Sequence, residues 1–532
     1  MSIITVKEQR DVVPNWRSFK KTAILGELFS TPKVYSHAPI YPITPYLLAW
    51  RENKTIAYAS DLLSASVVNG DNSSPEIVEA ARYILDSDIS SEPMKKLASS
   101  VLTSNVPREH LNSSNTQDTL NNLFNKEERN KELIRFIRHE NAKFPYNPIA
   151  YCELARCYTL LGANLQAEKA MRTALHLAPT SIYITRCAAR MYIQIGDTAA
   201  AHKIVTRNPA IREDPWLIAS EIALNSSIGR NSRFAKKGIQ VLRSGNFSPF
   251  TCSELASAIG TLEMANGKRK KSIEYLNLSL YDPNDNSLAQ AEWMKTEHND
   301  LRLNFRDYSS LLLKSEAEAR YAFNCRRYND ALVESIKWID DLPYDKTPIL
   351  FSSSVAHTFL KDYETASKIL RIGLIANPGD SMLTNNLAYV LALNGEVDEA
   401  ESLMSNPHLY DASTPIDSLV CHIATKGLIE FRKKHSDEGR RLYTEAINLA
   451  NERCDDKTLV RKAILNYLRE EIIANGCATS DIEPIITQIN PGNDREMCQL
   501  QTDVISEMEK QKQRQNLLQI PSFDITSVKS KI

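Results

Sequence analysis

The chain has 532 residues, with 64 Lys and Arg against 65 Asp and Glu and a formal net charge of −1. A chain of this length is too long for one compact core, which predicts several domains or an extended repeat array. The even charge balance argues against a strongly basic protein that binds nucleic acid through its net charge. Glycine, at 16 residues, is roughly 3% against a usual value of about 7%, which favours helices joined by short turns over strands or glycine-lined phosphate sites.

The start of the chain, MSIITVKEQRDVV, lacks the apolar core of a signal peptide. No run approaches the roughly 18 apolar residues of a membrane helix. The 9 cysteines form no Cys-x-x-Cys pair, and we interpret those inside helical patterns as small buried residues in a reducing compartment. We therefore expect a cytoplasmic protein without a membrane partner.

Residues 1–44 are predicted to form an extended N-terminal arm with a short helix. In this arm, Trp16 and Phe19 stand in otherwise polar sequence, and they either pack onto the rest of the protein or dock a partner. Thr44-Pro45 and Ser74-Pro75 match an N-cap followed by a first-turn proline. Residues 45–140 are therefore predicted to be an N-terminal helical domain, for which degenerate repeats are one interpretation.

A helical pattern with a fixed offset follows. In residues 151–179 the apolar positions fall three and four apart and Gly162 interrupts them once. A shift of 34 residues maps Ala155 onto Ala189 and Gly162 onto Gly196. A period near 34 with two helices per unit is typical of a solenoid of helical repeats.

This pattern resembles the tetratricopeptide repeat (TPR) family over about residues 148–453. The resemblance implies an all-α fold, a right-handed superhelical solenoid of helix–turn–helix repeats in which small residues let neighbouring helices approach closely. The matching positions are Tyr151, Leu154, Ala155, Tyr158, Ala167, Ala174, Pro179, Ala189, Tyr192, Gly196, Ala201, Leu387, Ala388, Gly395, Ala400, Gly427, Tyr443 and Ala446.

The repeat assignment divides the rest of the chain. Residues 141–453 are predicted to form the TPR array, with an irregular insert at 287–311 that does not fit the repeat. Residues 454–500 are predicted to be C-terminal capping helices, because 459–476 is amphipathic. Residues 501–532 are predicted to be a polar helix and a tail.

The resemblance also predicts where a partner binds. TPR ligands lie in the concave groove lined by the first helix of each repeat, which here places Arg156, Arg186 and Arg190 on one wall. Three guanidiniums fit a carboxylate or a phosphate, and the alternative is that they pair with acidic neighbours or are solvated. We expect reversal of all three to Glu to weaken capture of a partner without unfolding the array. The carboxylate clamp of the family is absent, because Cys152 and Arg156 replace its Lys and Asn.

A second wall of the same groove is more apolar. The same mapping places Arg320, Asn324, Phe351, Asn385 and Tyr389 along it. Aromatic rings with a few amides fit an extended or helical peptide. The alternative interpretation is core packing.

The enzyme-like patterns fail on inspection. GTLEMANGK at 260–268 has two more residues between its glycines than a phosphate-binding loop and lacks the following Ser or Thr. DPNDNS at 282–287 lacks the turn glycine of a calcium loop, and no histidines show paired metal spacing. We therefore predict no catalytic residues, no cofactor and no metal.

These observations favour a non-catalytic scaffold or adaptor that binds another protein or a peptide segment in its concave groove. One alternative is a regulatory sensor whose superhelix responds to a small peptide or a nucleotide-like ligand. Another is an RNA-binding helical-repeat protein, because basic runs occur at 268–271 and 432–441. These runs fall near turns, where charged residues are usually solvated, so nucleic acid is not the expected partner.

Overall fold

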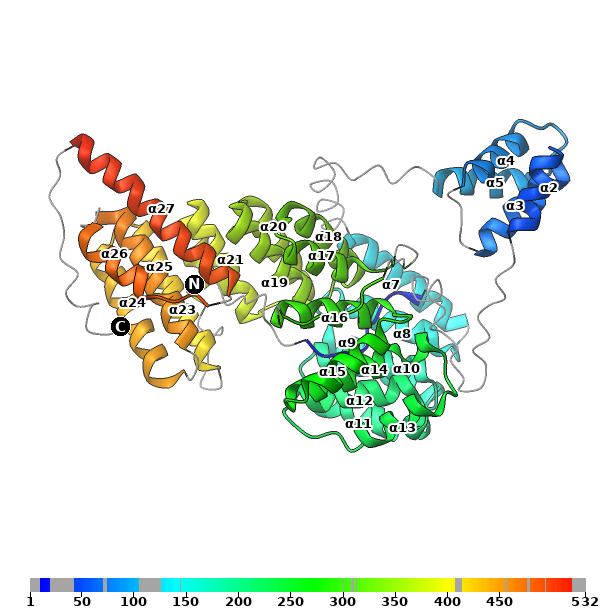
Figure 1. The fold of residues 1–532 in the computed structure, drawn as a ribbon, viewed down its shortest axis with the longest axis horizontal. Helices are drawn as coiled ribbons and strands as arrows, with labels where there is room; N and C mark the ends of the chain where they lie inside the picture. The colour runs from blue at the N-terminus through cyan, green and yellow to red at the C-terminus, as the bar shows by residue number, and fades with distance from the viewer. Residues whose placement is uncertain are drawn as a thin grey trace. The chain divides into compact units, whose positions relative to one another are not determined.

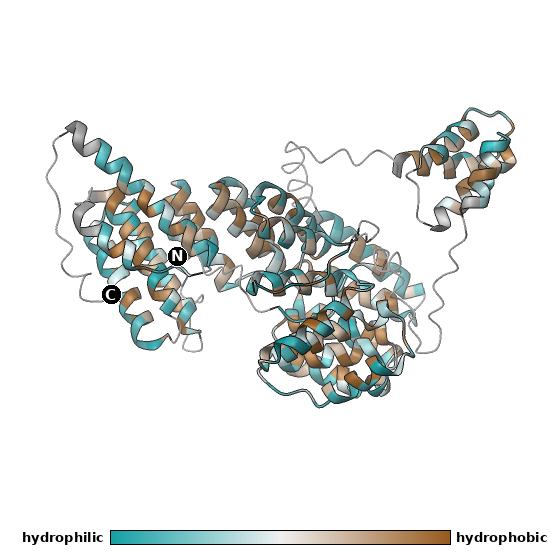
Figure 2. Ribbon diagram, in the orientation of Figure 1, coloured by the Kyte–Doolittle hydropathy of each residue, from teal (hydrophilic) through white to brown (hydrophobic). Residues whose placement is uncertain are grey.

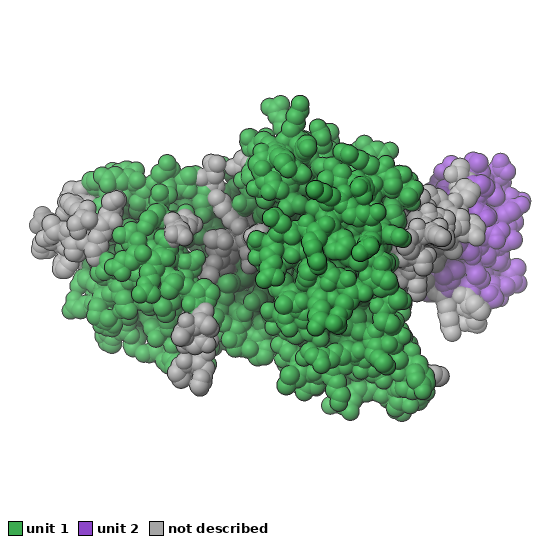
Figure 3. All heavy atoms as spheres, turned by 90° about the horizontal axis from the view of Figure 1, so that it is seen from below, with its two compact units in different colours: residues 1–29, 120–532 green, residues 30–119 purple. Residues whose placement is uncertain are grey.

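The computed structural model shows two compact units, residues 30–119 and residues 1–29 with 120–532 (Figure 3). Every regular element in the described residues is a helix, so the predicted all-α fold class is confirmed. The described residues are 10–19, 43–69, 74–104, 126–143, 145–298, 300–306, 308, 311, 313–406, 414–454, 457–475, 479–492 and 494–518.

The smaller unit is built from α2 (Thr44–Glu52), α3 (Ile56–Asn69), α4 (Pro75–Leu85) and α5 (Glu92–Ser104). Trp50, Leu62 and Ile77 are buried at its centre. Ser74 caps α4 as predicted, because its side chain accepts a hydrogen bond from Ile77 N. Helix α2 differs from the prediction. Ile43 occupies its N-cap position and Thr44 already lies inside the helix.

The larger unit stacks helical hairpins along the chain, as Figure 1 shows. The two helices of each hairpin pack on each other, and successive hairpins pack together through the first helix, the second helix or both. The paired helices are α8 (Pro148–Thr159) and α9 (Asn164–Leu177), α10 (Ile182–Gln194) and α11 (Thr198–Arg207), α12 (Pro215–Ser227) and α13 (Ala235–Ser244), α14 (Pro249–Ala265) and α15 (Arg269–Ser279), α17 (Ser315–Asn324) and α18 (Tyr328–Asp341), α19 (Lys346–Ser354) and α20 (Tyr363–Ala376), α21 (Ser381–Asn394) and α22 (Val397–Met404), and α23 (Ile416–Arg432) and α24 (Ser436–Arg453).

Shorter elements complete these hairpins. Helix α7 (Lys126–Lys143) precedes the array and packs on α8. A 3₁₀ turn, η2 (Pro209–Arg212), links α11 to α12, and a π-helical segment, η3 (Val355–Leu360), continues α19. Hydrophobic residues concentrate on the helix faces that meet between hairpins, which Figure 2 shows in brown.

Most first helices begin at polar N-caps, although α17 and α23 do not. The side chains of Asn147, Ser181, Asp214, Ser248 and Asp380 each accept a hydrogen bond from a backbone N–H in the following turn. Such a cap satisfies one of the N–H groups that a helix start leaves without an intrahelical partner. The hairpin starts are therefore encoded locally.

The turn inside a hairpin requires one residue with positive φ. Gly162 (φ +67°) and Gly395 (φ +90°) occupy it where the TPR resemblance is closest. Arg326 (φ +60°) and Lys434 (φ +68°) occupy it in less regular hairpins. A residue with a Cβ atom loses about 1–2 kcal/mol in this conformation. The turn geometry therefore persists in hairpins whose sequence has another residue in place of the glycine.

We expect Arg326→Gly and Lys434→Gly each to raise the free energy of unfolding by about 0.5–1 kcal/mol, because glycine adopts a positive φ without a Cβ clash. Both side chains are exposed, so little packing is lost. Urea unfolding followed by circular dichroism measures the change. Gly395→Ala is the matched control and should lower stability. A gain for Gly395→Ala would contradict the turn assignment.

The predicted irregular insert at 287–311 begins inside a regular helix, because residues 287–297 belong to α16 (Asp285–Glu297). The helix packs on α14 and α17 as the first helix of a hairpin would. It is buried on all sides, with polar residues such as Asn286 and Gln290 among its buried positions. The amphipathic period is therefore missing from its sequence. The irregular part begins after Glu297, because the described residues between there and Ser315 form no regular element.

The C-terminal region ends in helices that pack on the array. Helix α25 (Lys457–Asn475) packs on both α23 and α24. It is followed by α26 (Thr479–Gln488) and α27 (Arg495–Leu518). Helix α27 packs on α25, α26 and η3, so the predicted boundary at residue 500 falls within one helix. Residues 519–532 of the predicted tail lie outside the described residues.

Candidate functional site

Residues 10–19, which we call the N-terminal strip, lie inside the larger unit (dark blue in Figure 1). The strip is extended for most of its length and contacts α8, α16, α17 and the α18–α19 loop. Trp16 is 0% exposed and Val12 1% exposed. We call the surface that holds the strip the inner groove. Of the two interpretations of Trp16, packing onto the array is confirmed.

The inner groove holds the strip through its backbone. Gln290 Nε2 donates to Arg10 O at 2.8 Å, and Asn286 Nδ2 donates to Val13 O at 2.9 Å. Tyr344 Oη accepts from the N–H of Trp16 at 3.2 Å and lies 2.9 Å from its carbonyl oxygen. Amide and hydroxyl side chains can bind any extended backbone in this way.

The charges of the strip and of the groove are complementary. Arg10 donates to both carboxylate oxygens of Glu316, at 2.7 and 2.9 Å. Arg17 donates to Asp341 at 2.6 Å and to Asp285 at 2.5 Å. These groups are all buried or nearly so. Removing one partner from such a buried ion pair is strongly unfavourable, because the other charge then stays buried without compensation.

Distant repeats close around the strip. Gln194 of α10 donates to Tyr344 O and to Asn377 Oδ1, both at 2.7 Å. The Trp16 and Tyr344 rings lie 5.6 Å apart at this junction. The array therefore curls far enough that α10 contacts the α18–α19 loop, and the strip lies in the space between them.

Two of the predicted arginines form buried ion pairs with other repeats, and the pair of Arg190 spans this closure. Arg186 Nη2 donates to Glu254 of α14 at 3.0 Å and lies over the Trp216 ring at 5.0 Å. Arg190 pairs with Asp345 at the start of α19. These contacts match the alternative interpretation, pairing with acidic neighbours. A partner contact at these buried arginines stays a prediction.

Arg156 lies at an opening beside the strip. Its Nε donates to Glu153 Oε2 at 3.3 Å, and its side chain lines a cavity of about 280 Å³. Ser18 of the strip, Leu160 and Ile372 also line the cavity. Of the three predicted arginines, Arg156 is the one that borders this space.

The predicted apolar wall is largely core. The Phe351 ring lies 5.7 Å from Phe323 and 5.9 Å from Trp338, and all three side chains are buried. Arg320 lies over Trp338 at 5.3 Å, and Asn324 Oδ1 accepts from a threonine hydroxyl at 3.0 Å. Each side chain is used within the fold because these faces meet the neighbouring hairpin. This matches the alternative interpretation, core packing.

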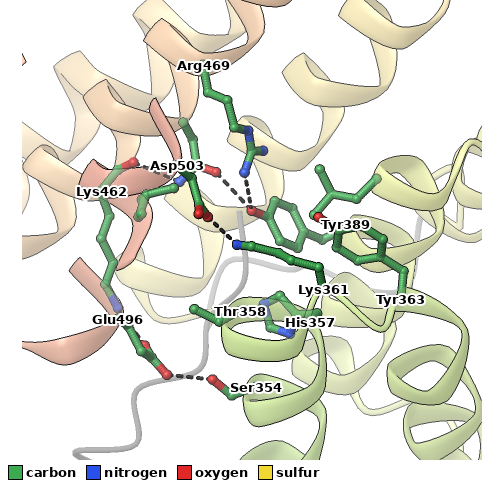
Figure 4. Close-up of a pocket in the computed structure, with 13 residues that line it drawn as sticks. Ser354, His357, Thr358, Lys361, Tyr363, Tyr389, Lys462, Arg469, Glu496 and Asp503 are labelled. Carbon is green, nitrogen blue, oxygen red and sulfur yellow. Dashed lines mark hydrogen bonds and ion pairs between the residues drawn. The ribbon is translucent and has the colours of Figure 1, made fainter. Parts of the chain in front are cut away.

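The last two predicted residues lie on α21. Asn385 is buried inside the array. Tyr389 lines a polar pocket between η3, α21, α25 and α27, shown in Figure 4. The Tyr389 hydroxyl donates to Asn466 Oδ1 at 3.0 Å and lies 3.4 Å from Arg469 Nη1. Burial lowers the pKa of the nearby His357 to about 4, so this imidazole is neutral at pH 7.

Helix α27 closes the polar pocket on one side. Its Glu496 accepts from Lys462 at 3.1 Å and from Ser354 at 2.6 Å. Asp503 pairs with Lys361 across the mouth (Figure 4). The remaining cavity is about 50 Å³, which is room for a few water molecules. The C-terminal helix therefore occupies this part of the surface much as the strip occupies the inner groove.

Sequence reasoning missed the residues that hold the strip. Gln290 lies in the segment that the sequence predicts to be irregular, Asp285 and Asn286 lie just before it in the DPNDNS stretch rejected as a calcium loop, and Tyr344 lies in a loop. The burial of so many polar residues on α16 becomes visible only in the structure. Trp16 and Phe19 were identified as candidates for packing or docking, but the surface that holds them was not.

Glu292 of α16 has an unusual pKa. Burial raises it from 4.5 to about 7, and Glu292 Oε2 is buried without a hydrogen-bond partner in the described structure. A raised folded-state pKa contributes stability that is complete below the unfolded value and is lost as pH rises through about 7. We expect Glu292→Gln to be nearly neutral at pH 4.5 and to stabilise the protein by about 2–3 kcal/mol at pH 8. Urea unfolding at several pH values measures this.

Glu316 provides a control of opposite sign. Burial acts to raise its pKa, but the charges of Arg10 and Arg320 outweigh burial and lower the pKa to about 2. Its contribution is present above 4.5 and is lost as pH falls through about 2. Glu316→Gln should therefore destabilise the protein at neutral pH. A pH-independent effect of Glu292→Gln would contradict the burial of an uncharged carboxyl group.

The fold and the groove define a helical-repeat protein with TPR-like hairpins. No family model matches the chain, and no curated protein matches it in sequence. Solved structures with a related arrangement include yeast Tom70, at 14% identity and a TM-score of 0.29, covering 75% of this chain and 96% of that chain.

A human IFIT1 dimer with PPP-AAAA matches at 10% identity and a TM-score of 0.34, covering 91% of this chain and 95% of that chain. The Naa15/Naa10 structure bound to HypK-THB matches at 12% identity and a TM-score of 0.23, covering 89% and 75%. Because these likenesses are distant, we base the function on the contacts of the groove.

None of the described helices combines the length and apolarity needed to cross a membrane. In the same part of the chain, no group of His, Cys, Asp and Glu side chains is arranged to hold a metal ion.

Proposed function

We propose that this protein is a non-catalytic scaffold of tetratricopeptide repeats that binds a protein partner by taking an extended segment of it into the inner groove. The N-terminal strip supports this most directly. Asn286, Gln290 and Tyr344 contact the backbone of the strip, and hydrogen bonds to the main chain are one general source of affinity for extended peptides. The surface is thus chemically suited to a polypeptide ligand.

The opening at Arg156 supports the same role. Its cavity of about 280 Å³ borders Ser18 of the strip, and Leu133, Leu160 and Ile372 supply apolar walls. A partner segment that follows the path of the strip would reach this opening. Arg156 is therefore the predicted partner-binding residue that we retain for the inner groove.

The other two functions are less well supported. The polar pocket of about 50 Å³ is small beside the roughly 300–1,000 Å³ of ordinary small-molecule sites, so it does not favour a nucleotide-like ligand. Several cations of the basic runs pair with acidic neighbours. For example, Arg269 pairs with Asp300 and Arg440 with Glu471, both at 2.8 Å. The described basic turns thus do not favour RNA.

Affinity capture tests the scaffold role. The tagged full chain, with Trp16→Ala and Arg17→Ala to release the strip, would be exposed to extract of the native host, with and without a capped synthetic peptide of residues 10–19. We expect proteins that this variant retains to be lost when the peptide competes, and to be retained less when Arg156→Glu is added. Leu165→Ala, at an outer position that is 80% exposed, is the matched control. Failure of every captured protein to respond to the peptide or to Arg156→Glu would overturn the role.

A further inference from the structure

The carboxylates of the inner groove define the chemistry of what it binds. Asp285 is buried, and its side-chain hydrogen bonds come from Asn15 and Arg17 of the strip. Asp341 also accepts from Arg17, and Glu316 accepts from Arg10. The cations of the strip therefore neutralise carboxylates contributed by three different helices.

If the strip left the groove, the carboxylates that it covers would either become exposed to solvent or stay buried with fewer counter-charges. Asp285 would lose both of its donors, which is unfavourable for a carboxylate in a site of this depth. An occupant that replaces the strip must therefore bring a cation to Asp285 and Asp341, and a second cation is favoured beside Glu316, which would otherwise keep only Arg320. An uncharged or acidic peptide does not meet this requirement.

Between the two arginine positions, the groove selects an extended chain with an aromatic side chain. Trp16 packs on the Tyr344 ring at 5.6 Å, directly before Arg17. Val12 inserts among apolar residues of α12 and α14, including Ile218 and Leu255. Hydrogen bonds from Asn286 and Gln290 to backbone carbonyls need no particular side chain.

The strip behaves as a ligand in its contacts. It belongs to no helical hairpin, and its described contacts with the groove are made by side chains of the array rather than by a shared backbone ladder. Because it is covalently attached through residues 20–125, it competes at an effective concentration of up to about millimolar. A free ligand would therefore bind weakly to the intact chain even if the groove fitted it well.

We propose that the inner groove accepts, from a protein partner, an extended basic segment with two arginines and an aromatic residue beside the second, and that the N-terminal strip is a built-in competitor for this segment. The proposal rests on the scaffold role and names the chemistry of its partner. It makes strip release the step that opens the groove.

Peptide exchange after cleavage tests the proposal on protein that has already folded. A site-specific protease sequence is inserted between residues 29 and 30, the boundary of the two compact units, and the purified full chain is cut. A fluorescent, capped peptide of residues 10–19 is then added, and its anisotropy is followed. We expect the peptide to bind the cut protein at least about 100-fold more tightly than the uncut protein, because the competitor is no longer tethered.

The matched control peptide carries Glu at the positions of Arg10 and Arg17, and it should not bind. Asp285→Asn with Asp341→Asn in the cut protein should weaken binding of the unmodified peptide about tenfold or more. Absence of exchange, or unfolding of the cut protein, would overturn the proposal by showing that the strip is part of the core. Equal binding of the control peptide would overturn the basic specificity. The scaffold role would fail separately, in the capture experiment.

Discussion

Replacement of Trp16 by alanine is expected to lower the free energy of unfolding of the larger unit by about 3–5 kcal/mol, the usual loss for a buried tryptophan. Trp16 is 0% exposed, and the Tyr344 hydroxyl contacts both its N–H and its carbonyl oxygen. Urea unfolding measures the change. If the strip docks as a ligand, Trp16→Ala cannot lower the free energy of unfolding by more than the free energy of docking. The rest of the array stays folded once the strip is released.

A double substitution distinguishes docking from core packing. Once Trp16→Ala has released the strip, Arg17→Ala should add almost nothing, because Arg17 no longer contacts Asp285 or Asp341. Tyr443→Ala is the matched control, since Tyr443 is buried in α24 and contacts Phe431 and Tyr467 instead of the strip. Its effect should add to that of Arg17→Ala. Additive losses for Trp16→Ala and Arg17→Ala would contradict strip release.

Arg186→Met is expected to cost about 3–5 kcal/mol, because it leaves the carboxylate of Glu254 buried without its cation. Glu254 is 1% exposed and also accepts from Asn284 at 2.8 Å. The loss should appear in urea unfolding as a lower midpoint. This differs from the expectation drawn from the sequence, in which reversal of the inner arginines leaves the array folded. Reversal of Arg186 to Glu would place two carboxylates together and is expected to unfold the larger unit.

The double variant Arg186→Met with Glu254→Gln is the control for this prediction. Removing both charges eliminates the unpaired carboxylate, so most of the stability should return. Met also keeps part of the packing against Trp216. If the double variant were as unstable as Arg186→Met alone, the loss would come from packing, and the ion pair would not be its cause.

Part of the candidate site was predictable. The 34-residue offset placed Arg186 and Arg190 on α10 and Arg156 on α8, all first helices of hairpins. Their partners were not predictable, because Glu254 and Asp345 belong to other repeats and the period relates only neighbouring units. In the strip, only Trp16 and Phe19 were identified from the sequence. Packing onto the array and docking of a partner both need such aromatic residues, so the sequence could not distinguish them.

The sequence by itself determined the helical hairpins, since their N-caps, their turn glycines and the three-and-four spacing of apolar residues act within one repeat. Only the tertiary structure decided what fills the groove. Trp16 contacts Tyr344 across 328 positions of the chain, and Arg17 contacts Asp341 across 324. Such pairings depend on how far the stacked hairpins curl, and small rotations summed over many repeats set that curvature.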